Sequence, residues 1–314
     1  MAQATATTHR RSGGFWGRIR QSDLSEALWG YFLISPWLVG LLIFVAGPML
    51  YSVYLSLTRY NLMSAPQWVG AFNYGYLAAD PLVWQSLKVT AIYTFLGVPM
   101  RVVLALLVAM LLNQQVRAMP LFRTIFYLPS VVSGVAVAIL WMWILSPEYG
   151  LLNSALAKVG ITGPRWLMDQ DTALFAMIVM SLWGVGANMV IFLAALQGVP
   201  QHLYEAADVE GASRLQKTWH VTIPSISPST FFVLIMSIIG SFQVFTQGFV
   251  MTNGGPNNST LFYVLYLYRN AFQLLRMGYA SALAWVLFII IMACTALVLR
   301  SSALWVSYEG ELKK

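Results

Sequence analysis

The chain has 314 residues, of which 59% are hydrophobic and 9% are charged, and its formal net charge is +7. A soluble domain usually carries about 25% charged residues, so this composition excludes an ordinary water-soluble enzyme and a disordered protein. A free nucleic-acid binder is also excluded, because the basic residues are scattered between apolar runs and form no dense basic stretch. We therefore expect an integral membrane protein. Its single cysteine, Cys294, excludes an intrachain disulfide.

Six apolar runs approach or exceed the length of about 20 helical residues that a bilayer requires. In chain order they cover residues 31–57, 86–112, 121–145, 174–196, 229–250 and 282–299. The first run is too long for a signal-peptide core and lacks a clear cleavage site, so we expect it to be retained. Residues 261–272 are apolar but short, and Arg269 interrupts them. This pattern favours a half-buried helix on the membrane surface.

The basic residues indicate the orientation of these six helices. In the six-helix arrangement one side of the membrane holds eleven Lys and Arg residues and the other side holds six. Because cytoplasmic loops carry the excess of Lys and Arg, both chain ends are predicted to be cytoplasmic. The expected division is an N-terminal tail over 1–28, a first membrane helix with an extracytoplasmic loop over 29–85, a core of five helices over 86–305 and a C-terminal tail over 306–314.

The loop between the fourth and fifth runs is the most polar stretch in the middle of the chain. Helix-forming residues cover 200–215 and include Glu-Ala-Ala at 205–207. Gly211 then permits a sharp change of chain direction, and Pro224 and Pro228 stop a helix before the fifth run. We expect a short helix, a glycine turn and a second short helix. Such a loop is either a solvated connector or a docking element for a cytoplasmic partner.

The spacing within this loop resembles the signature of ABC-importer permeases, in which Glu-Ala-Ala precedes a glycine and then an apolar residue before a proline. That family commonly has Asp before the glycine and Leu before the proline, where this chain has Glu210 and Ile223. Residues 72–90, 147–174 and 251–285 also resemble segments of carbohydrate-uptake permeases, in the same order along the chain. The resemblance therefore covers most of the chain apart from the N-terminal tail.

The resemblance implies an all-α fold with six transmembrane helices, that of type I ABC importer permeases, in a bacterial-type inner membrane. It implies a subunit of a binding-protein-dependent importer that forms half of the path for a sugar, of di- or oligosaccharide size. The implied partners are a second, related permease, two copies of an ATP-binding subunit and an extracytoplasmic solute-binding protein. None of the five lysines follows a glycine, so the chain has no P-loop. We expect no enzymatic activity and no cofactor in this chain, ATP and Mg being used by the partner ATPase.

The resemblance assigns the contact with the ATPase to the loop at about 198–224. In that role Glu205 would carry a charge to the partner, Ala206 and Ala207 would keep the docking helix slim, and Gly211 would set the turn. The complete candidate set is Glu205, Ala206, Ala207, Glu210, Gly211, Ile223 and Pro224.

The resemblance also places the solute path along the fourth and fifth runs, and helical spacing selects the face. A stripe of small and polar residues follows the fifth run, and an indole and an amide cluster on the fourth. The indole would stack on a sugar and the amide would bond its hydroxyls. Packing between membrane helices produces the same pattern. The candidates are Trp183, Gly184, Asn188, Ser237, Gly240, Ser241, Val244 and Gln247, with Gly248 at the end of the stripe and Gln243 as a weaker candidate.

Arg101 is an ionisable residue inside the second run. Such residues are costly in a membrane and usually pair or face water, and we favour structural pairing over substrate contact. The resemblance also leaves uptake of glycerol phosphate or another non-sugar solute as the alternative, because relatives in that family carry such a solute. A phosphate would favour an inward-facing arginine near the path, and Arg101 is the one candidate. An ion-driven secondary transporter is less favoured, because the runs hold no acidic coupling groups and show no internal repeat. No metal site is expected, since His9, His202 and His220 are isolated.

Overall fold

The computed structural model describes residues 21–114 and 116–307, with side chains from residue 26 onward. Two compact units make up the chain, Met1–Tyr54 and Leu55–Lys314, and each is described by itself. His9 and the basic residues of the two tails lie outside the described residues. The orientation of the chain ends and the predicted domain bounds therefore stay predictions.

The described part of the first unit, from residue 21 onward, is one continuous helical segment. Helix α1 (Gln21–Leu41) passes through a π-helical turn (Leu42–Ala46) into α2 (Gly47–Ser56), whose last residues belong to the second unit. Pro48, two residues after the end of this turn, has no amide N–H to continue the usual bonding. The apolar side chains of this segment are exposed, as in a helix that faces lipid.

The second unit begins with a small hairpin, in which β1 (Thr58–Arg59) pairs antiparallel with β2 (Gln67–Trp68). Helices α3 (Phe72–Ala79) and α4 (Pro81–Leu112) follow. The next elements are α5 (Met119–Tyr127), a 3₁₀ turn (Leu128–Ser130), α6 (Gly134–Ile144), α7 (Leu151–Lys158), α8 (Gln170–Leu182) and α9 (Gly186–Gln197). The 198–224 loop contains α10 (Gln201–Val209), α11 (Arg214–Lys217) and a π-helical turn (Thr218–Thr222). The remaining helices are α12 (Ile223–Ser225), α13 (Ser227–Phe242), α14 (Tyr263–Tyr268) and α15 (Met277–Ser302), with π-helical turns at Gly248–Thr252 and Arg269–Gln273.

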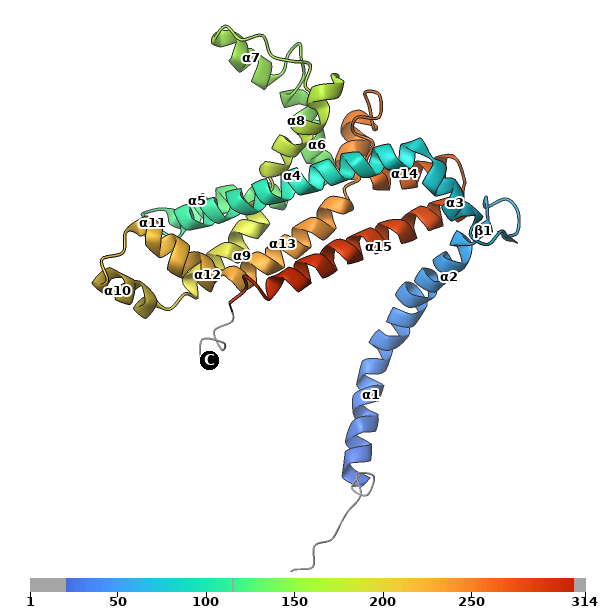
Figure 1. The fold of residues 1–314 in the computed structure, drawn as a ribbon, viewed down its shortest axis with the longest axis horizontal. Helices are drawn as coiled ribbons and strands as arrows, with labels where there is room; N and C mark the ends of the chain where they lie inside the picture. The colour runs from blue at the N-terminus through green and yellow to red at the C-terminus, as the bar shows by residue number, and fades with distance from the viewer. Residues whose placement is uncertain (1–20, 115, 308–314) are drawn as a thin grey trace, which may run out of the picture. The chain divides into compact units, whose positions relative to one another are not determined.

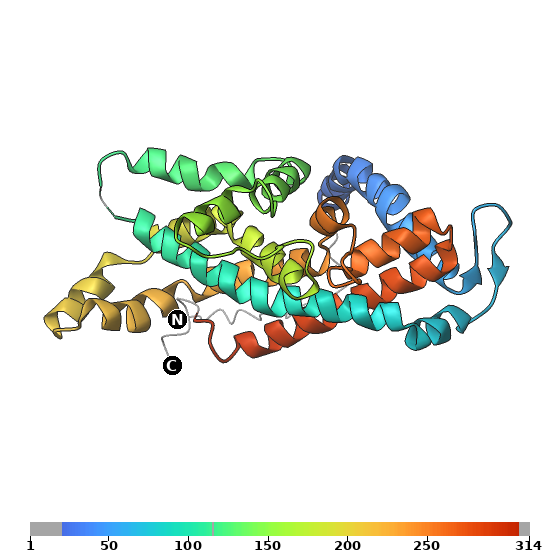
Figure 2. The same ribbon diagram turned by 90° about the horizontal axis from the view of Figure 1, so that it is seen from above.

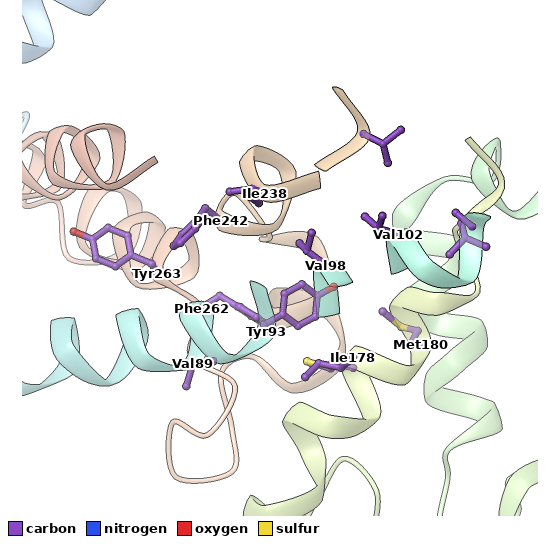
Figure 3. Close-up of a cluster of buried hydrophobic side chains, with 14 of the residues drawn as sticks. Val89, Tyr93, Val98, Val102, Ile178, Met180, Ile238, Phe242, Phe262 and Tyr263 are labelled. Carbon is purple, nitrogen blue, oxygen red and sulfur yellow. The ribbon is translucent and has the colours of Figure 1, made fainter. Parts of the chain in front are cut away.

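Helix α4 is central to the second unit, because it packs against α8, α9, α13 and α14. Figure 1 shows α4, α13 and α15 running beside one another. Tyr93 of α4 meets the ring of Phe262 edge-on, with 5.1 Å between the ring centroids, and both side chains are buried (Figure 3). The 198–224 loop lies at one end of this bundle and α3 with the hairpin at the other, as Figures 1 and 2 both show.

The described residues contain three unbroken helices long and apolar enough to cross a membrane, and up to six spans if each bent pair is one span. The unbroken helices are Glu26–Ser56, Pro81–Leu112 and Met277–Ser302. The bent pairs are Met119–Ser130 with Gly134–Ile144 at 95°, Gln170–Leu182 with Gly186–Gln197 at 43°, and Arg214–Ser225 with Ser227–Phe242 at 67°. The expectation of six spans corresponds to the larger number.

Two of the six predicted runs are bent: the run 121–145 breaks at 131–133, after Pro129, and the run 174–196 bends at 183–185. One sequence prediction about these helices was wrong. The segment 261–272 is not a half-buried surface helix: Leu261, Phe262 and Tyr263 are each 0% exposed. Its apolar side is covered by α4 and α15, which pack against α14.

Asp80 joins three elements at one end of the bundle. Its carboxylate accepts hydrogen bonds from the hydroxyls of Tyr266 (2.5 Å) and Tyr279 (2.7 Å), and from the backbone N–H of Leu82 as the N-cap of α4 (3.0 Å). Side-chain bonds to a charged group contribute about 1.5–3 kcal/mol each, so Asp80→Ala is expected to lower the free energy of unfolding by about 3 kcal/mol. Thermal unfolding in detergent measures this. Asp171→Ala, at an exposed position, is the control and should leave the midpoint unchanged. Equal midpoints for the two variants would contradict the prediction.

Candidate functional site

A cavity of about 430 Å³ lies inside the second unit, and we call it the central cavity. Its wall is formed by α4, by the break between α5 and α6, by the bend between α8 and α9, and by α13 with the residues that follow it. The bend of 43° between α8 and α9 lies at 183–185, and two of its residues, Trp183 and Gly184, line the cavity. The volume lies within the range of about 300–1,000 Å³ typical of small-molecule sites.

Seven of the eight candidate path residues line the central cavity: Trp183, Gly184, Asn188, Ser237, Gly240, Val244 and Gln247. Asn188 on α9 donates from Nδ2 to Oγ of Ser237 on α13 at 3.3 Å, so the two helices present one polar patch. Trp183 is 38% exposed and meets Trp141 edge-on at 6.3 Å between centroids. The structure brings these residues together, while their contact with a solute stays a prediction.

The remaining members of the stripe lie elsewhere. Ser241 is buried beneath the wall and accepts a hydrogen bond from Arg101. Gly248 is buried against Phe262, whose ring would lie 2.5 Å from a Cβ at position 248, so this glycine serves close packing. Gln243 is exposed and does not line the cavity.

Eight further residues of the cavity wall were not predicted from the sequence, five of them outside the fourth and fifth runs and three within these runs. The additional lining residues are Tyr93, Pro129, Val132, Gly134, Val137, Met180, Ser181 and Met236, and Arg101 also lines the cavity. One local signal was available, because Tyr93, Gly97 and Arg101 recur every four residues and so share a face of α4. The break at 131–133 also had a local signal, because Pro129 and the Ser133–Gly134 pair flank it.

Arg101 lies on an unbroken α4, which continues through Pro99. Its guanidinium donates from Nε to the carbonyl oxygen of Gly97 at 3.3 Å and from Nη2 to Oγ of Ser241. It also lies 5.6 Å from the centroid of the Tyr93 ring, within the range of a cation–π contact. The expected structural pairing is present, but all these partners are neutral and the side chain also borders the cavity.

The 198–224 loop has the predicted order of helix, glycine turn and helix. Gly211 has a φ of +77°, and its N–H donates to the carbonyl of Asp208 at 3.0 Å. The N–H of Ala212 donates to the carbonyl of Ala207 at 2.9 Å, which completes a Schellman motif at the end of α10. Ser213 then caps α11 in a capping box with Gln216.

Two side-chain contacts close this loop into one block. Lys217 forms an ion pair with Asp208 at 2.6 Å, and the hydroxyls of Tyr204 and Thr222 are 3.0 Å apart. The first contact is partly exposed and contributes little stability by itself. Together the contacts hold α10 against the chain that leads through α12 into α13.

The outer side of the loop is available to a partner. Glu205, Ala206, Glu210 and Gly211 are exposed, while Ala207, Ile223 and Pro224 are half-buried. Sequence analysis missed three apolar side chains that are strongly exposed here: Val209 (90%), Leu215 (68%) and Trp219 (61%). Large apolar side chains within an otherwise polar loop were the signal for them. Exposed apolar groups beside polar ones are typical of a protein interface.

The described residues contain no group of three or more His, Cys, Asp or Glu side chains that could hold a metal ion. His202 and His220 are exposed on the 198–224 loop, as expected. Nδ1 of His220 lies 3.0 Å from the carbonyl oxygen of Gln216.

Comparison with known proteins places this geometry in context. Residues 101–306 match the family described as binding-protein-dependent transport system inner membrane component. The probable ABC transporter permease protein YesP of Bacillus subtilis is 41% identical over 93% of this chain and 95% of its own. The arabinooligosaccharides transport system permease protein AraP of the same organism is 33% identical (90% of each chain). The sulfoquinovosyl glycerol transport system permease protein SmoG of Agrobacterium fabrum is 31% identical (90% of this chain, 92% of its own).

A chain in the crystal structure of a bacterial alginate ABC transporter, in complex with an alginate pentasaccharide-bound periplasmic protein, has a similar fold. The TM-score is 0.78 with 23% sequence identity, and the match covers 90% of this chain and 96% of that chain. At this identity the likeness shows the fold alone. It agrees with the all-α arrangement built from the described helices.

Proposed function

The chain belongs to the family of binding-protein-dependent transport system inner membrane components, and we propose that it forms one half of the path by which an ABC importer carries an oligosaccharide. The expected all-α permease fold is confirmed by the family match and by the structural likeness. The observation that carries the proposal is the convergence of seven candidate path residues on the central cavity.

The chemistry of the cavity suits a saccharide. Trp183 offers a flat apolar surface, and the linked pair of Asn188 and Ser237 offers an amide and a hydroxyl for hydrogen bonds. The relatives named for their solutes, AraP and SmoG, are named for saccharides. A non-sugar solute such as glycerol phosphate is the second candidate, and Arg101 at the cavity wall is the observation that favours an anion.

The energy for transport would come from a separate ATP-binding subunit that uses ATP and Mg. In this proposal two copies of that subunit, a second permease and an extracytoplasmic solute-binding protein complete the importer, and this chain hydrolyses no ATP. The 198–224 loop and both chain ends would lie on the cytoplasmic side of a bacterial-type inner membrane.

The path from the loop to the cavity is short and continuous along the chain. Glu205 on α10 belongs to the block that the Asp208–Lys217 ion pair and the Tyr204–Thr222 contact close. That block continues through α12 into α13, which carries Ser237 and Gly240 at the cavity. A displacement of the loop by the ATPase would therefore move α13 as a lever.

Replacing Glu205 by Lys is expected to separate the chain from its ATPase. The side chain is exposed, so the substitution reverses a charge at the proposed interface without altering the core. Because a like-charge contact at an interface costs several kcal/mol, recovery of the ATPase should fall about tenfold or more. The complex is purified from its native membranes in mild detergent, and the co-purified subunits are quantified.

Glu148→Lys makes the same change of charge at an exposed position outside the loop and is the matched control. It should leave recovery of the ATPase and the second permease unchanged. Recovery of the wild-type chain alone, with uptake intact in vesicles that lack any ATPase, would overturn the proposed function in favour of an ion-driven carrier.

A further inference from the structure

Arg101 brings a positive charge to the central cavity that no acidic side chain offsets. The residues that line the cavity include no Asp or Glu. Within the described part of the chain, the one ion pair is that between Lys217 and Asp208 on the 198–224 loop. Tyr93 is the other titratable residue of the cavity wall.

The neutral contacts of Arg101 orient its side chain without neutralising it. The carbonyl of Gly97 accepts from Nε, and the hydroxyl of Ser241 accepts from Nη2. Tyr93 presents its ring face to the guanidinium. These contacts come from α4 itself and from α13, so two helices fix the position of the head group at the cavity wall.

A charge held at membrane depth by neutral groups alone is costly, and such residues usually serve a solute or an ion path. A guanidinium has five N–H donors, and two of them donate in the contacts above. The remaining donors lie on a side chain that borders the cavity. A planar guanidinium binds a carboxylate through two parallel hydrogen bonds.

We propose that the central cavity selects a saccharide that carries a carboxylate, as a uronic acid unit does, and that Arg101 binds this carboxylate. The proposal rests on the proposed function, since it names the class of saccharide carried through the same cavity. The carboxylate supplies the counter-charge that the wall lacks. The sugar ring then lies against Trp183 and the Asn188–Ser237 patch. Ser241 is a positioning residue for Arg101.

The test measures ATP-driven uptake by the complete importer with its binding protein in proteoliposomes. The probes are three matched pairs of disaccharides, and the two members of a pair differ only at C6, which is a carboxylate in the acidic member and a hydroxymethyl group in the neutral member. The acidic members are built from galacturonate, glucuronate or mannuronate, and the neutral members from galactose, glucose or mannose. Uptake of glycerol phosphate is measured as well, to distinguish recognition of a phosphate from recognition of a carboxylate. The quantity compared is the ratio of acidic to neutral uptake.

The wild-type importer is expected to carry at least one acidic disaccharide in preference to its neutral partner. Loss of hydrogen bonds to a charged group predicts that Arg101→Gln lowers acidic uptake by about 10- to 100-fold and lowers the ratio of acidic to neutral uptake. Arg101→Lys keeps the positive charge but cannot form two parallel hydrogen bonds to a carboxylate, so it should retain part of the preference for acidic disaccharides. Ser241→Ala should lower the ratio of acidic to neutral uptake less than Arg101→Gln does, because it removes one contact of the Arg101 side chain but leaves that side chain in place.

Lys158→Gln removes one positive charge from an exposed position outside the cavity and should leave the ratio unchanged. Membrane abundance and recovery of the ATPase establish that each variant assembles. Uptake confined to neutral disaccharides or to glycerol phosphate, or an unchanged ratio in an assembled Arg101→Gln importer, overturns the proposal. Uptake of no saccharide of either class overturns the proposed function itself.

Discussion

Gly211→Val is expected to lower ATP-driven uptake about tenfold or more, while the amount of the chain in the membrane stays the same. The φ of +77° at Gly211 lies in the left-handed region, which costs an L-residue about 1–2 kcal/mol and is worse for a β-branched side chain. A Cβ at this position would meet nothing within 4 Å. The cost therefore comes from the backbone conformation and is confined to the loop.

The loss follows from the population of the docking conformation. Each 1.4 kcal/mol changes an equilibrium about tenfold, so the valine would lower the population of the Schellman turn about tenfold or more relative to other conformations of the loop. Without the bonds from Gly211 to Asp208 and from Ala212 to Ala207, α10 and α11 lose their relative orientation. The exposed side chains of Glu205 on α10 and Trp219 after α11 would then lose their fixed relative orientation.

Two further variants decide whether the turn is responsible. Gly211→Asn should keep most of the uptake, because Asn tolerates the left-handed region. Gly160 has the same φ of +77° and the same open space around a Cβ, but it follows α7. In Gly160→Val, the amount of ATPase that co-purifies with the complex should be the same as in the wild type. Uptake by Gly211→Val at the wild-type rate would remove the turn from the coupling mechanism.

The turn was predictable from the sequence because its signals are local. Gly211 follows a run of helix formers, and the bonds that define the turn join residues at most five apart. The cavity-facing stripe that begins on α13 was predictable for a similar reason, since Ser237, Gly240 and Val244 keep helical spacing. Two members of the stripe do not line the cavity: Gly248 packs against Phe262, and Ser241 is buried against Arg101, a residue 140 positions away. No local pattern carries that contact.

The wrong prediction for the segment 261–272 came from the charge of Arg269. Arg269 suggested a membrane surface, but its guanidinium bonds the backbone carbonyl and the side-chain oxygen of Asn253 at the edge of the segment. Residues 261–263 are completely buried, and the hydroxyl of Thr90 on α4 accepts from the backbone N–H of Tyr263 at 2.9 Å. The arrangement depends on α4, which lies about 170 residues earlier in the chain, and so it could not be read from hydropathy.

Gly186→Val is expected to be the most destabilising single substitution at the central cavity. A Cβ at position 186 would lie 2.4 Å from the carbonyl oxygen of Phe126 and 2.8 Å from the Cα of Tyr127. Both atoms belong to the backbone, so no side chain can rotate away and α5 must separate from α9. Overpacking of this kind costs about 1–3 kcal/mol and occasionally more, and we expect a loss of at least about 3 kcal/mol.

The effect should reach the cavity because α5 packs against α9 and each leads to a different part of the wall. The chain after α5 contributes Pro129 and Val132, and α9 contributes Asn188. In Gly186→Val, the midpoint of thermal unfolding of the purified complex and the rate of uptake of the preferred disaccharide should therefore both fall. Gly184→Ala is the control for stability, since its Cβ would meet only the Ser181 carbonyl oxygen at an ordinary 3.8 Å. An unchanged unfolding midpoint in Gly186→Val would mean that α5 can move away from α9 at little cost, and the break at 131–133 would then act as a hinge in the cavity wall.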